Sequence, residues 1–190
     1  MLRLTTIVIL SIYLSIVSAC QMLVPPELLN GCTFSPLTIT NPTNGYTVNR
    51  FNCNEVINKD VFTEQPYVYF SNAEEEKSYT LLMVDPDSPL HNAGQFYLHW
   101  AVTNVPGYIL KQGLGCTVGD LIFEYTGPSP AAFSGPHRFM IFAYVQMSNY
   151  LTAPLPAYRS RFVLMDWLDS FGGEDTLRGP VASVGYITEF

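Results

Sequence analysis

The sequence predicts a mainly β domain with one helix close to its C-terminal end. Three apolar runs carry this prediction: Tyr79–Val84, Phe96–Val102 and His137–Val145. Each run has the length of a strand and is apolar at nearly every position rather than at alternate ones. Strands of this kind are buried on both faces, so we expect them to lie inside a covered sheet.

Shorter runs before and after these three complete the predicted strands. Leu37–Thr40 and Tyr46–Val48 are separated by Asn-Pro and Asn-Gly turn signals, and Tyr67–Phe70 starts just after a proline. Leu121–Tyr125 and the segment from Pro180 to Phe190 are the remaining predicted strands.

One stretch, Arg159–Phe171, has the periodicity of an amphipathic helix. Its apolar residues recur at intervals of three and four, at Leu164, Trp167, Leu168 and Phe171. Ser160 is the predicted N-cap, and Gly172-Gly173 provides a left-handed stop at the other end.

The N-terminus resembles a targeting segment. Residues 1–19 contain an early arginine, an apolar middle and small residues at Ser18 and Ala19, which predicts a secretory signal peptide and an extracellular protein. An alternative interpretation is a bacterial lipoprotein box, in which Cys20 would carry the lipid. Residues 20–190 are then expected to form a single domain without a membrane span.

The charge of the chain argues against one class of partner. It has 9 basic and 16 acidic side chains, a formal net charge of −7, and no basic cluster. Proteins that bind nucleic acid need such a cluster, so we expect no nucleic-acid partner. We expect a monomer without a cofactor.

Four cysteines predict two disulfide bonds in a secreted protein. Their connectivity stays open, because four cysteines allow three pairings. None of them has zinc-ligand spacing, so no metal site is predicted. The cysteines are Cys20, Cys32, Cys53 and Cys116.

Carboxylates and a histidine interrupt the two most apolar segments. Asp85 and Asp87 end the first strand in an Asp-Pro-Asp-Ser-Pro turn, and His99 lies inside the second strand. A lone histidine on such a strand is more often a satisfied core residue than a working group, and Asp and Pro are common in ordinary turns. The turn and the histidine together favour a functional site.

Regular alternation along the second strand predicts which residues share its faces. One face would carry Tyr97, His99 and Ala101, and the other would carry Leu98, Trp100 and Val102.

The loop Gly127–Pro136 is rich in proline and precedes a strand that begins with His137. Its fixed φ values leave a few amide donors that point in defined directions. The motifs MVDPDSP and LHW and the stretch YTGPSPAAFSGPHRFMIFAYVQ resemble the phosphatidylethanolamine-binding protein family. The resemblance extends from about Pro66 to the C-terminus and is weak before it.

The resemblance implies a large, mostly antiparallel sheet packed with a smaller sheet, with helices on the other side. It also implies a small cavity that accepts phosphate-like anions. By motif, the ligand-binding residues would be Asp85, Asp87, Ser88, Tyr97, His99, Gly127, Ser129, Pro130 and His137. Ser88 stands where alanine is usual in the family, and Phe139 where many members have tyrosine. An alternative for His137 is a strand-edge histidine in a turn.

Three classes of function follow. The first is a secreted, non-enzymatic binding protein for a small anionic ligand or a phospholipid head group. The second is a protease inhibitor or protein-interaction module, which the resemblance also allows. An enzyme is the least favoured, because no activated nucleophile or metal-ligand pattern accompanies the histidines.

Overall fold

The computed structural model describes residues 24–113 and 118–190 of the chain. A seven-stranded sheet forms its centre, with the order β1-β10-β8-β5-β6-β7 and with β9 paired to β6. All pairs are antiparallel except β1 with β10. The strands are β1 (Ser35–Pro36), β5 (Ser78–Asp85), β6 (Gln95–Pro106), β7 (Asp120–Phe123), β8 (His137–Gln146), β9 (Phe162–Val163) and β10 (Leu177–Thr188). The prediction of a mainly β fold with one large sheet is confirmed.

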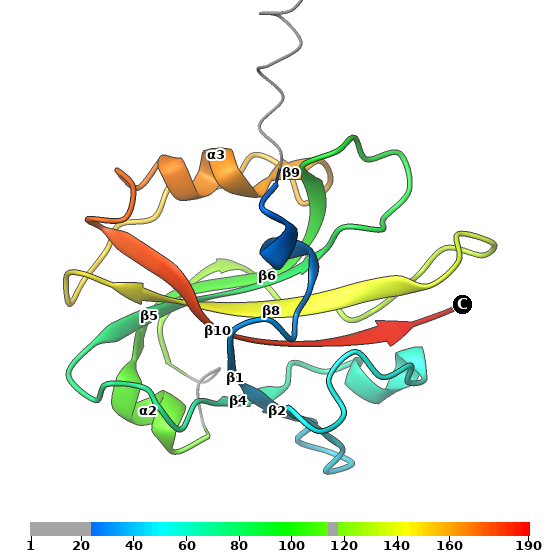
Figure 1. Cartoon of the computed structure of the whole chain (residues 1–190), viewed down its shortest axis with the longest axis horizontal. Coiled ribbons are helices and arrows are strands. Elements are labelled where there is room, and N and C mark those ends of the chain that lie inside the picture. Colours follow the sequence, from blue (N-terminus) through cyan, green and yellow to red (C-terminus); the bar gives the residue numbers. More distant parts are fainter. Residues whose placement is uncertain (1–23, 114–117) are drawn as a thin grey trace, which may run out of the picture.

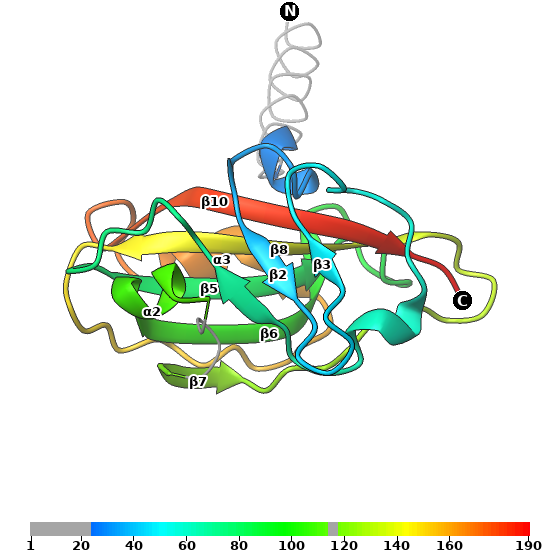
Figure 2. The ribbon, with the colours of Figure 1, turned by 90° about the horizontal axis from the view of Figure 1, so that it is seen from below.

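A smaller, three-stranded antiparallel sheet lies against one face of the large sheet (Figure 2). Its order is β3-β2-β4, with β2 (Thr38–Thr40), β3 (Thr47–Val48) and β4 (Tyr67–Tyr69). Helix α3 (Leu164–Asp169) covers the opposite face, so the molecule has three layers (Figure 1). Short helices complete the chain: η1 (Pro26–Leu29), η2 (Lys59–Phe62) and α2 (Gly107–Lys111).

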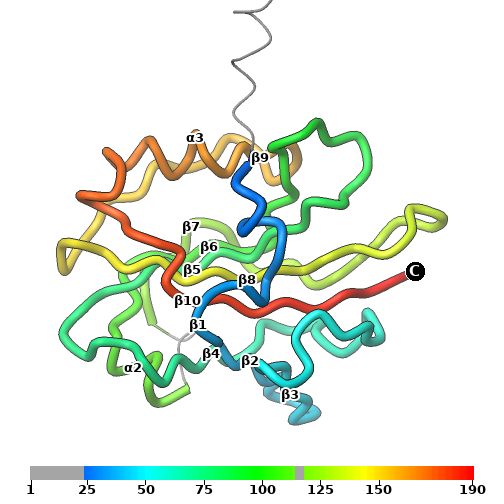
Figure 3. The backbone as a smooth tube through the Cα atoms, viewed as in Figure 1, coloured from blue at the N-terminus to red at the C-terminus, as the bar shows by residue number. Residues whose placement is uncertain are grey.

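Two hydrophobic cores explain why the central strands are apolar on both faces. Leu81 and Met83 of β5 belong to the core under the small sheet, whereas Leu82 and Val84 belong to the core under α3. The first described segment, 24–36, runs from the side of α3 to β1 at the edge of the large sheet, and β2 of the small sheet follows it directly (Figure 3). Each central strand is therefore fixed by packing on both sides.

A β-bulge in β6 overturns the predicted alternation. Val84 pairs with Leu98 and Met83 pairs with Trp100, so His99 has no partner on β5. Two successive residues then lie toward the same side of the sheet. Trp100 joins the small-sheet core, while Leu98 and Ala101 both belong to the core under α3.

Helix α3 is shorter than predicted. Phe162 pairs with Phe96 of β6, which keeps this part of the chain extended, and Arg161 is left-handed at φ 56°. The N-cap is Val163 instead of Ser160. The predicted stop is confirmed, because Gly172 and Gly173 have φ values of 93° and 81°. Helix α2 is not among the predicted elements.

One disulfide bond joins Cys32 to Cys53, with their Cα atoms 5.9 Å apart. Cys20, Cys116 and the predicted signal peptide lie outside the described residues, so the second disulfide stays a prediction. No helix among the described residues combines the length and the apolar character that a membrane crossing requires. Within the same residues, no three metal-binding side chains gather.

Candidate functional site

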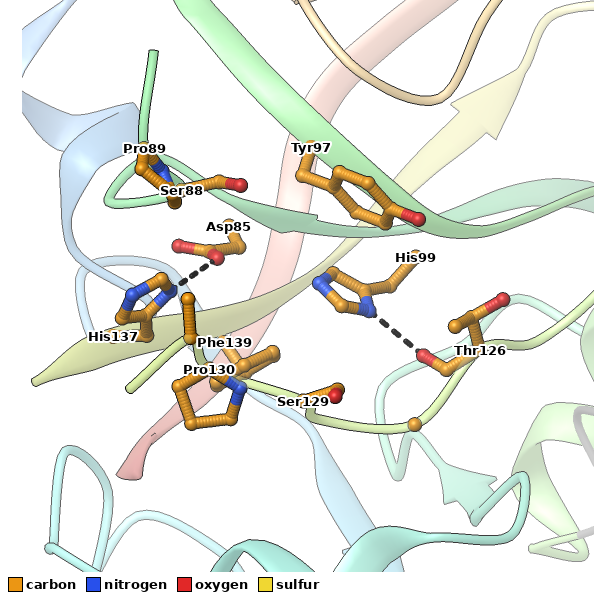
Figure 4. A pocket seen from close by; sticks show the side chains of 12 residues that line it. Asp85, Ser88, Pro89, Tyr97, His99, Thr126, Ser129, Pro130, His137 and Phe139 are labelled. Atoms are coloured by element: carbon orange, nitrogen blue, oxygen red, sulfur yellow. Dashed lines mark hydrogen bonds and ion pairs between the residues drawn. The ribbon is translucent and has the colours of Figure 1, made fainter. Parts of the chain in front are cut away.

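A cavity of about 410 Å³ opens where β5 ends and β8 begins. The loop between β5 and β6 and the loop before β8 project at this end of the molecule (Figure 1). The lining residues are Asp85, Ser88, Pro89, Tyr97, His99, Thr126, Gly127, Ser129, Pro130, Ala131, His137 and Phe139. The structure thus brings together eight of the nine predicted ligand-binding residues, drawn from three separate segments (Figure 4).

Asp85 and His137 form a buried pair in one wall of the cavity. Nδ1 of His137 lies 2.7 Å from Oδ2 of Asp85, and the side chains are only 2% and 4% exposed. Oδ1 of Asp85 accepts the amide of Asp87 at 2.7 Å. Burial holds the pKa of Asp85 above its ordinary value, although both hydrogen bonds oppose that rise. Asp85 therefore fixes the orientation of the His137 ring.

The second ring nitrogen of His137 is also occupied. Nε2 lies 2.8 Å from Oγ of Ser134, and the Ser134 hydroxyl donates to the carbonyl oxygen of Ala131 at 2.7 Å. A hydroxyl has one proton, so with this assignment Ser134 accepts from Nε2–H. Both ring nitrogens of His137 are therefore hydrogen-bonded, one to Asp85 and the other to Ser134.

His99, which is 5% exposed, lies in the opposite wall. Its Nδ1 donates to the carbonyl oxygen of Thr126 at 2.7 Å. Burial lowers the pKa of His99 to about 4; nearby Arg159 and His137 add to this effect, and the Thr126 bond opposes it. The ring is therefore neutral at pH 7. It is partly a satisfied core residue, but Nε2 points toward the side of the cavity where Asp85 and His137 lie (Figure 4).

Asp87 is the one predicted ligand-binding residue that does not line the cavity. Its two carboxylate oxygens accept three hydrogen bonds of 2.7–3.0 Å from Arg138: from the backbone amide, Nε and Nη2. Burial raises the pKa of Asp87, but the bonds and charge of Arg138 outweigh it, so this pKa lies below its ordinary value. Arg138 also donates to the carbonyl oxygen of Leu29. Asp87 therefore positions the turn rather than a ligand.

Sequence reasoning missed Arg138 and Thr126. The Arg beside His137 in the Gly-X-His-Arg motif was a visible signal for the first. No signal could have found the second, because Thr126 acts on His99 through its backbone carbonyl. Gly127 holds the loop close to η2, since a Cβ there would lie 3.0 Å from the carbonyl oxygen of Phe62.

The family model of phosphatidylethanolamine-binding proteins matches residues 38–175. The match begins well before Pro66, where the motif resemblance was expected to start. It covers the three strands of the small sheet and the whole cavity lining.

Curated relatives in plants match parts of the chain. FLOWERING LOCUS T of Arabidopsis thaliana is 34% identical over 124 residues, 64% of this chain and 64% of that protein. MOTHER of FT and TFL1 homolog 2 of Oryza sativa subsp. japonica is 38% identical over 88 residues, 44% of this chain and 47% of that protein. The chain thus spans about half to two thirds of their lengths.

Solved structures share the fold. A carboxypeptidase Y inhibitor, solved with its cognate proteinase, superposes with a TM-score of 0.60 at 17% identity, covering 82% of this chain and 84% of the inhibitor chain. The phosphatidylethanolamine-binding protein of Plasmodium vivax gives 0.59 at 18% identity, covering 82% and 86%. With the family match across most of the described residues, the chain belongs to the phosphatidylethanolamine-binding protein family.

Proposed function

We propose that the protein is a secreted, non-enzymatic binding protein that takes a small phosphate-bearing ligand into the cavity between His99 and His137. The observation that carries this proposal is the convergence of polar groups from three segments. Hydroxyls of Ser88, Tyr97 and Ser129 lie in the lining beside the amides of a proline-rich loop. A cavity of about 410 Å³ suits a head group or another small molecule.

Two observations support secretion. The first 19 residues have the pattern of a signal peptide, and Cys32 and Cys53 form a disulfide bond, which persists in oxidising compartments. Intact-mass measurement of the exported protein should find a chain that starts at Cys20 and gains four thiols only on reduction. Retention of residues 1–19 or two free thiols would contradict this expectation.

The chain of contacts Ser134–His137–Asp85 superficially resembles a catalytic triad. A nucleophilic serine must donate its proton to the histidine. The Ser134 hydroxyl instead donates to the Ala131 carbonyl, and Ser134 lies outside the cavity lining. These contacts support binding rather than acyl transfer. A fluorophosphonate probe should leave the mass of the protein unchanged, and labelling of Ser134 would overturn the non-enzymatic assignment.

Calorimetry with phosphoethanolamine tests the binding proposal. We expect one site per chain and a loss of about fivefold in affinity in Ser129→Ala, the value of about one hydrogen bond. Ser71→Ala is the matched control, because Ser71 lies in the turn before β5, at the other end of that strand from Asp85. No binding, or equal losses in both variants, would reject the cavity as the site.

Protease inhibition is the alternative that the family allows, since one structural neighbour is a carboxypeptidase Y inhibitor. A panel of serine carboxypeptidases assayed with excess protein tests it. Inhibition that survives Ser129→Ala would show that this role does not depend on the cavity.

A further inference from the structure

His99 has one ring nitrogen committed and one free. A carbonyl oxygen only accepts, so the 2.7 Å contact with Thr126 places the proton on Nδ1. In the neutral ring Nε2 then carries a lone pair. It has no hydrogen-bond partner among the described residues, and it points toward the side of the cavity where Asp85 and His137 lie (Figure 4). His99 therefore offers a ligand an acceptor.

The rest of the lining supplies no unbalanced positive charge. The described lining residues include no lysine or arginine. Both nitrogens of His137 are occupied, one by the Asp85 carboxylate and one by the Ser134 hydroxyl. Arg138 is held by Asp87 and the Leu29 carbonyl.

Arg159 is the arginine whose charge acts on His99, and its guanidinium is also committed. It donates to the backbone carbonyl oxygens of Leu98, His99 and Glu124. A fully ionised anion in the cavity would therefore meet a bare lone pair at His99 and the carboxylate of Asp85. An anion that retains a proton could donate it to Nε2.

We infer that His99 makes the cavity selective for phosphate that carries a proton, either inorganic phosphate or the monoanion of a phosphate monoester, over sulfate and phosphodiesters. This inference rests on the proposed function and names its ligand class. Sites built to accept a hydrogen bond reject analogues that lack the donor, because their polar groups are left unpaired. Phosphate and sulfate have the same shape, so the proton is the feature that separates them.

Calorimetry at pH 7 and fixed ionic strength tests the inference with three probes: inorganic phosphate, sulfate and dimethyl phosphate. Inorganic phosphate keeps a proton under these conditions, whereas the other two have none. We expect phosphate to bind about tenfold more tightly than either, the equivalent of one charge-assisted hydrogen bond. In His99→Leu this preference should disappear. In Ser129→Ala all three affinities should fall while the preference remains.

A measurement on the unaltered protein covers the case in which His99→Leu fails to fold. ¹⁵N NMR of the imidazole should show Nε2 without a proton, and its resonance should move on addition of phosphate but not of sulfate. A protonated Nε2, or equal affinities for phosphate and sulfate, would overturn the inference and leave the proposed function standing. Failure of all three probes and of phosphoethanolamine to bind would overturn both.

Discussion

The two walls of the cavity each present a histidine, and the two rings are almost equally buried: His99 is 5% exposed and His137 is 2% exposed. Their partners differ. His99 donates to the backbone carbonyl of Thr126, whereas His137 is bonded to the carboxylate of Asp85 and the hydroxyl of Ser134. Equal burial therefore gives unequal chemistry. The His137 wall is a closed network, and the His99 wall keeps one nitrogen for a ligand.

This difference explains how one small site can be both rigid and selective. A fully bonded network holds the Asp85 turn and the start of β8 in place. The free nitrogen of His99 lies in a fixed direction because Thr126 orients the ring.

The largest loss of stability should come from breaking the Asp85–His137 pair in the His137 wall. Asp85→Ala leaves a buried imidazole without its carboxylate, and breaking such a pair costs about 3 to 5 kcal/mol of unfolding free energy. Urea denaturation of the variant measures this loss. Asp85→Asn keeps the shape and should cost less. If Asp85→Ala lowered the unfolding free energy by less than about 1 kcal/mol, the hydrogen-bond network of the His137 wall would not be what stabilises this end of the fold.

The His99 wall should make stability depend on pH. The pKa of His99 is about 4 in the folded protein, below an ordinary value of about 6.5, because burial disfavours the charged ring. Between these values the unfolded chain binds more protons, so His99's contribution to stability is lost as pH falls. We expect a loss of about 2 kcal/mol from this group between pH 7 and pH 5.

The loss should be measured as the difference between the unaltered protein and His99→Gln. Asp85, whose pKa is raised, acts in the opposite direction in both proteins and cancels from the difference. Parallel stability curves for the two proteins would show that His99 titrates normally in the folded state.

Removing the Asp87–Arg138 pair behind the cavity should cause the smallest loss of stability. Asp87→Ala removes the acceptor of three bonds from Arg138, but both side chains are partly exposed, so the expected cost is about 1 to 2 kcal/mol. Ligand affinity should also fall, because the turn that carries Ser88 loses its anchor. Arg138→Lys keeps the charge without the planar fork and should recover only part of the stability. Unchanged affinity in Asp87→Ala would separate the turn from binding.

The sequence predicted the parts of the fold that depend on burial. Strands such as His137–Val145 are apolar at nearly every position, and the structure covers them on both faces. The bulge at His99 was beyond reach, because it depends on the register between β5 and β6 rather than on either strand alone. The predicted start of α3 was wrong because it also depends on a contact with another strand: Phe162 pairs with β6, and this pairing overrides the helical periodicity.

The candidate site was predicted as a set of residues but not as a set of roles. Motif resemblance identified the cavity lining, and Asp87 was included because it belongs to the same Asp-Pro-Asp-Ser-Pro turn as Asp85. Only the contacts show that Arg138 takes both oxygens of Asp87. The protonation of His99 depends on a backbone carbonyl, and no pattern of side chains encodes it.

The bulge in β6 also bears on how such a site can arise. Without His99, the neighbours would alternate regularly: Leu98 in the core under α3, Trp100 in the core under the small sheet, and Ala101 under α3 again. His99 is thus an extra residue in the alternation of its own strand, and its ring packs against Tyr97 and Phe139. Inserting one histidine codon into a regularly alternating strand would place an imidazole in the cavity wall. The residues before and after it would keep their places in the two cores.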